Sequence, residues 1–67
     1  MPPNADALIA RAAEACARGA LSEAADAYRD AAAIEARTGD LERALACLRM
    51  STSLRVEIVH AERRASA

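Results

Sequence analysis

The sequence predicts an all-α protein of three antiparallel helices, at about residues 5–18, 21–38 and 40–64. Apolar residues recur at three- and four-residue intervals within these segments, which is the period of one face of an α-helix. Single glycines separate the segments, and short connections of this kind favour antiparallel neighbours. We therefore expect a single helical domain over residues 1–67, with a third helix longer than the other two.

The first predicted helix, residues 5–18, begins after Asn4, whose side chain can accept a hydrogen bond from an amide of the first turn. Asp6 places negative charge in that turn, where the helix dipole favours it. The apolar face of this helix comprises Leu8, Ile9, Ala12, Ala15 and Cys16. Gly19 is expected to end the helix, because glycine readily adopts the left-handed conformation found there.

The second predicted helix, residues 21–38, ends at Gly39 and has two apolar stripes. One stripe comprises Leu21, Ala25, Tyr28 and Ala32, and the other comprises Ala20, Ala24, Ala27, Ala31 and Ile34. A surface helix needs only one such stripe, so two predict a neighbouring helix on each side. Because most of these positions are alanine, the neighbouring backbones can approach closely. We expect this helix to be the middle one of the three.

A short motif occurs at the start of the second helix and again at the start of the third. Glycine is followed by alanine five residues on, by tyrosine or leucine after four more, and by a small residue after three more. The two copies are Gly19, Ala24, Tyr28 and Ala31, then Gly39, Ala44, Leu48 and Ser51. The motif resembles the second half of a tetratricopeptide repeat, and Leu8 and Ala12 match the large and small packing positions of that family's first helix.

The resemblance implies tetratricopeptide-like helical hairpins and a role in protein interaction. It does not imply the concave peptide groove of that family, which needs several repeats. The two copies here are 20 residues apart, from position 19 to position 39, whereas tandem repeats of the family recur after about 34 residues. The second helix is therefore expected to take part in both hairpins.

The third predicted helix, residues 40–64, is capped by Asp40 and is longer than packing against the second helix requires. We expect the residues that cover the second helix to be Leu41, Ala44, Leu45 and Leu48. The second half has apolar residues on both sides, which favours an interaction surface. The predicted surface comprises Met50, Leu54, Val56, Ile58 and Val59. Two alternatives stay open: this half folds back into the monomer's own core, or it forms a strand, although no other segment could pair with one.

The candidates for chemistry are few. At their expected depths Cys16 and Cys47 are displaced by about 6 Å along the helix axes, which is unfavourable for a disulfide, so we interpret both as buried, small apolar residues. Together with His60 they lack the spacing of a zinc site. Asp26 and Asp30 share a polar face without the pocket that acid–base catalysis needs. We predict no catalytic site, no cofactor and no bound metal.

Composition limits the kind of partner. Hydrophobic residues make up 54% of the chain, but twenty of them are alanine and none is Phe or Trp, so the core is thin for a monomer. Nine arginines and ten acidic residues give a net charge of −1, without the basic stripe of a nucleic-acid binder. No segment has the length of apolar sequence that a membrane span needs, and the N-terminus lacks the features of a secretion signal.

We therefore expect a cytoplasmic protein that binds neither nucleic acid nor membrane. Arginine without lysine, beside so much alanine, is typical of GC-rich bacterial genomes. The predicted function is a non-enzymatic interaction module: a small adaptor or accessory subunit that binds a protein partner or itself through the second half of the third helix. A symmetric homodimer is the simplest form of self-association. The alternative is a purely structural homo-oligomer with no separate partner.

Overall fold

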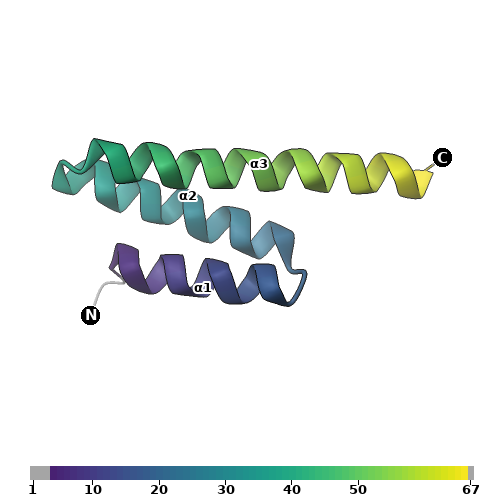
Figure 1. Ribbon diagram of the computed structural model, residues 1–67, viewed down its shortest axis with the longest axis horizontal. Helices are drawn as coiled ribbons and strands as arrows, with labels where there is room; N and C mark the ends of the chain where they lie inside the picture. Colours follow the sequence, from purple (N-terminus) through teal and green to yellow (C-terminus); the bar gives the residue numbers. More distant parts are fainter. Residues whose placement is uncertain (1–3, 67) are drawn as a thin grey trace.

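The computed structural model describes residues 4–66 and contains three helices: α1 (Ala5–Ala17), α2 (Leu21–Thr38) and α3 (Leu41–Ser66). Consecutive helices run antiparallel, and α2 packs against both α1 and α3 (Figure 1). The molecule is elongated, 43 × 21 × 14 Å, because α3 extends well beyond the corner that joins α1 and α2. The all-α fold is confirmed, with helix bounds within two residues of those predicted. The strand alternative for α3 is wrong, since α3 is one continuous helix that does not fold back on itself.

Local interactions at the helix ends explain these bounds. The Oδ1 atom of Asn4 accepts a hydrogen bond from the amide of Ala7 at 2.7 Å. The Oδ1 atom of Asp40 accepts one from the amide of Arg43 at 3.1 Å, so both predicted caps are confirmed. Ala20, which precedes α2, makes no side-chain cap.

The two corners have the same backbone geometry. Gly19 and Gly39 have φ angles of +76° and +91°, in the left-handed region that favours glycine. The residue after each glycine donates a hydrogen bond back across the corner, from Ala20 to the carbonyl of Ala15 at 2.8 Å and from Asp40 to that of Glu35 at 2.9 Å. These are the bonds of a Schellman motif, which satisfies carbonyls at a helix end. The repeated sequence motif therefore builds the same corner twice.

We predict that Gly39→Val lowers the free energy of unfolding by more than about 1 kcal/mol, because a β-branched residue is strained at this φ. A Cβ atom at Gly39 would meet no atom within 4 Å, so the cost arises from backbone conformation and not from a clash. Thermal melting measures the effect. Gly39→Asn is the control and should cost less, since asparagine tolerates the left-handed region. A melting temperature unchanged by Gly39→Val would contradict this account of the corner.

The core between the helices consists mainly of alanine. The fully buried side chains, with an exposed fraction of 0%, are Ala12, Ala15, Ala24, Ala25 and Ala31. Leu8 is the one large apolar side chain among residues 4–66 that is buried, and the half-buried Ile9, Tyr28 and Ile34 pack against the buried cluster that contains it. Both predicted stripes of α2 contribute to this core. The middle position of α2 is thereby confirmed.

The face of α3 that packs on α2 differs from the predicted one. Its buried residues are Ala44, Cys47 and Ser51. The hydroxyl of Ser51 donates a hydrogen bond to the backbone carbonyl of Ala25 at 2.9 Å, which shows how closely the two helices approach. The prediction that Leu41, Leu45 and Leu48 cover α2 is wrong, because all three are exposed. At so short a separation the contact has room for small side chains only.

We predict that Ala24→Leu or Ala44→Leu lowers the free energy of unfolding by about 1–3 kcal/mol, because the added atoms overpack a close helix contact. Ala24 is 0% exposed and Ala44 is 5% exposed. Ala33 is exposed on the polar side of α2, so Ala33→Leu is the matched control and should be nearly neutral. Denaturant titrations compare the three variants. Equal tolerance at all three positions would show that these helix faces are assigned wrongly.

Candidate interaction surface on the third helix

All the large apolar side chains that are exposed among residues 4–66 belong to α3. They are Leu41, Leu45, Leu48, Met50, Val56 and Val59, with exposed fractions between 43% and 64%. Five of them lie with Thr52 along one side of the helix. We call this set the apolar stripe: Leu41, Leu45, Leu48, Thr52, Val56 and Val59. Its first and last members are 18 positions apart in the sequence, or about 27 Å along the helix axis.

The apolar stripe and the contact with α2 occupy different faces of α3. At 3.6 residues per turn the centre of the stripe lies roughly 100° around the helix from the centre of the buried set Ala44, Cys47 and Ser51. Packing against α2 therefore leaves the stripe uncovered. An exposed ion pair of 2.8 Å joins Arg55 of α3 to Asp26 of α2 near the middle of the stripe.

A shallow hollow of about 410 Å³ lies over the second half of the apolar stripe. It is lined by Thr52, Arg55, Val56, Val59, His60 and Arg63. Its apolar floor is formed by the two valines, whose short side chains leave room between the longer arginines. The rim is cationic, because arginine stays charged at neutral pH. The hollow can therefore accept apolar side chains from a partner whose adjacent residues are neutral or acidic.

The predicted interaction residues divide among three faces of α3. Val56 and Val59 belong to the apolar stripe. Leu54 and Ile58 are half-buried and share the helix face of Ser51, toward α2. Met50 is exposed on the side of α3 opposite the stripe.

The structure joins Val56 and Val59 to Leu41, Leu45 and Leu48, which the sequence analysis had assigned to the core. A signal for this grouping is present in the sequence: the stripe positions follow one another at intervals of 4, 3, 4, 4 and 3 residues. Such intervals keep residues on one helix face.

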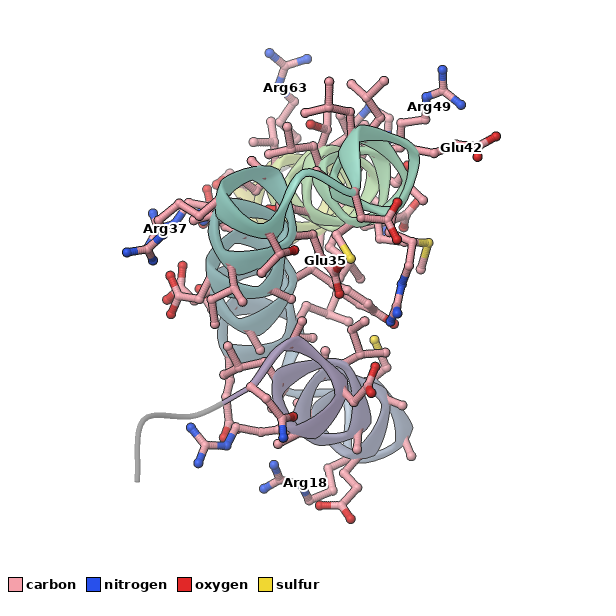
Figure 2. The ribbon with its side chains drawn as sticks, turned by 90° about the vertical axis from the view of Figure 1, so that its left-hand side faces the viewer. Arg18, Glu35, Arg37, Glu42, Arg49 and Arg63 are labelled. Carbon is pink, nitrogen blue, oxygen red and sulfur yellow. The ribbon has the colours of Figure 1, made fainter. Side chains whose placement is uncertain are left out.

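A second group of polar residues joins all three helices at the opposite end of the molecule. The guanidinium of Arg43 lies 2.8 Å from Asp6 of α1 and 3.4 Å from Glu35 of α2. Glu35 is only 6% exposed, and its side chain points into the space between α1 and α3 (Figure 2). The hydrogen bond from Arg43 to Asp6 and the charge of Glu35 raise the pKa of Arg43. Arg43 therefore stays charged and forms ion pairs with both carboxylates, which link α3 to α1 and to α2.

The sequence offers two cysteines and one histidine as candidates for chemistry. Cys47 is buried as predicted, whereas Cys16 is only half-buried, and both thiols are free. Burial raises the pKa of the Cys47 thiol, which keeps it protonated and weakly nucleophilic. Within residues 4–66 no group of three or more His, Cys, Asp or Glu side chains is placed to hold a metal ion. His60 is exposed on the rim of the hollow.

No protein-family model, no curated protein and no solved structure matches this chain. In the part of the chain that the structure describes, no helix is both long enough and apolar enough to cross a membrane. The function is therefore inferred from the surface of α3 itself.

We predict that glutamate substitutions distinguish the exposed and half-buried faces of α3. Leu54→Glu with Ile58→Glu should lower the free energy of unfolding by about 2 kcal/mol or more, since two charges would be partly desolvated at half-buried positions. Leu45→Glu with Val56→Glu is the matched control and should stay within about 1 kcal/mol of the unsubstituted protein, because these side chains face solvent. Denaturation followed by circular dichroism in dilute solution, where association contributes little, measures both. The reverse order of stabilities would contradict the assignment of the two faces.

Proposed function

We propose that this chain is a non-enzymatic helical protein-interaction module, an adaptor or accessory subunit, and that its binding surface is the apolar stripe of α3. One observation carries the proposal. Among residues 4–66, all the exposed large apolar side chains lie on α3, while the core is built mainly of alanine. Contiguous apolar surface of this kind is typical of protein-binding sites. Burying it in a complex removes it from water, which stabilises the complex.

The stripe is presented on a rigid helix. The hydrogen bond from Ser51 to Ala25 and the ion pair between Arg55 and Asp26 hold α3 against α2 beneath the middle of the stripe. A surface that is already ordered before binding loses little conformational entropy when a partner packs on it.

The 20-residue repeat indicates what kind of partner the stripe suits. The α2 stripe that includes Ala25, the residue contacted by α3, comprises Leu21, Ala25, Tyr28 and Ala32. Adding 20 to each number gives the first four members of the apolar stripe: Leu41, Leu45, Leu48 and Thr52. The α2 stripe that packs on α3 therefore has a counterpart on α3, which is the apolar stripe. This counterpart is uncovered. The partner element that fits this position is another helix.

The two ends of this helical array differ in polarity. In helical repeat proteins the terminal helices expose a polar outer face, which keeps the array soluble. The outer residues of α1 are polar or alanine, and those of its middle turns are Ala10, Arg11, Ala13 and Glu14. The outer face of α3 instead exposes leucine and valine. Its composition is that of a helix that packs against a further helix.

Photo-cross-linking in cells of the source organism tests the proposal. A benzophenone side chain at position 45 lies in the apolar stripe, and the same side chain at the exposed position 33 of α2 is the matched control. We expect position 45, and not position 33, to form a covalent adduct with another polypeptide. The adduct should be lost when Leu48→Glu and Val56→Glu are added. Equal labelling at both positions, or none at position 45, would contradict the proposal.

A further inference from the structure

We propose that the occupant of the apolar stripe is α3 of a second copy of this chain, packed antiparallel in a twofold-symmetric dimer centred on Thr52. This inference rests on the proposed function, since it requires the stripe to be a binding surface. Three independent features of α3 point to it: the spacing of the apolar residues, their sizes, and the charges beside them.

The spacing of the stripe is symmetric about Thr52. Toward the N-terminus the next positions are Leu48, Leu45 and Leu41, at steps of 4, 3 and 4 residues. Toward the C-terminus they are Val56, Val59 and Arg63, at the same steps. A twofold axis perpendicular to α3 at Thr52 therefore brings each position of one copy level with a position of the other. The small threonine lies at the centre, where the two helices approach most closely.

The side chains brought level by this axis differ in size in a complementary way. Leu48 of one copy lies beside Val56 of the other, and Leu45 lies beside Val59. The larger residues of one copy thus enter the hollow over the valines of the other, which has a volume of about 410 Å³. Leu41 lies beside the aliphatic stem of Arg63, whose guanidinium can still reach water. A parallel pair would instead place leucine against leucine and valine against valine, leaving both hollows incompletely filled.

The charges beside the stripe are also complementary in the antiparallel arrangement. In an antiparallel pair related by this axis, each flank of one helix lies beside the same flank of the other helix. Helical spacing places Glu42 and Arg49 on one flank of the stripe, with Arg64 further around the helix on the same side. The axis brings Glu42 of one copy near Arg64 of the other. A parallel pair would bring the two Arg63 residues together.

The antiparallel direction also continues the fold. Consecutive helices of this protein run antiparallel, so a helix added on the outer side of α3 in the same manner would run antiparallel to α3 (Figure 1). The second copy supplies such a helix, and each copy covers the uncovered face of the other. In such a dimer both apolar stripes are covered and the polar outer faces of the two α1 helices stay exposed, which closes the assembly.

Cysteine trapping tests the direction and the register. In a background with Cys16→Ala and Cys47→Ala, Thr52→Cys should form a disulfide-linked dimer with itself under mild oxidation. Leu45→Cys should not link to itself but should link to Val59→Cys when the two proteins are mixed. We expect these reactions to be at least about tenfold faster than that of the exposed control Ala33→Cys, because dimerisation raises the effective concentration of the thiols. Self-linking of Leu45→Cys at the rate of Thr52→Cys would show a parallel pair and overturn the proposal.

Charge reversal tests the same register without oxidation. Glu42→Arg should weaken the dimer about threefold to tenfold in sedimentation equilibrium, since each copy loses one attraction and gains one repulsion. Adding Arg64→Glu should restore the affinity. Both positions are exposed, so neither change should alter helix content. Failure of the second substitution to restore affinity would overturn the proposed register.

The two proposals fail in different ways. A purified protein that stays monomeric at millimolar concentration, together with an adduct at position 45 to a different polypeptide, would overturn the dimer and leave the interaction module standing. A monomer with no adduct at position 45 would overturn both. An adduct with twice the mass of the chain, together with the predicted disulfides, supports both.

Discussion

Close packing of alanine along α2 is the constraint on which the rest of the structure depends. Because Ala24, Ala25 and Ala31 are fully buried alanines, a neighbouring helix can approach closely wherever its own side chains at the contact are small. This requirement selects Ala12 and Ala15 on α1, and it selects Ala44, Cys47 and Ser51 on α3. The leucines of α3 are excluded from the contact for the same reason. The apolar stripe is therefore a consequence of how the core is packed.

A core of alanine also links stability to association. Alanine buries little apolar area, and hydrophobic stabilisation scales with that area at roughly 25 cal/mol per Å². Much of the chain's large apolar surface lies in the stripe, so covering it adds stabilisation that the monomer lacks. Arg43, which pairs with Asp6 and Glu35, ties the starts of α1 and α3 to the end of α2 and holds the frame that presents the stripe. An association that buries the stripe should therefore raise the thermal stability of the whole chain.

The repeat of 20 residues explains why one surface is left open. Each copy of the motif ends one helix at a glycine and begins the next with a small residue that faces the preceding helix. The pattern specifies the face by which a helix packs on the preceding helix. It also specifies the face that is left to pack on the following helix. The outer face of α3 is therefore apolar and exposed. In the proposed dimer, a second copy in the antiparallel direction supplies the helix that covers this face.

The sequence by itself determined the helices and their ends, because capping by Asn4 and Asp40 and the left-handed glycines are interactions between residues a few positions apart. It also determined the middle position of α2, since two apolar stripes on one helix require two neighbours. Only the tertiary structure decided which face of α3 is buried, and hence that Val56 and Val59 are exposed in the apolar stripe while Leu54 and Ile58 are half-buried on the face of Ser51. Hydrophobicity ranks leucine above alanine, cysteine and serine, but the separation between two packed helices is a property of the pair. The sequence of one helix does not specify that separation, and the short separation excluded the leucines from the core.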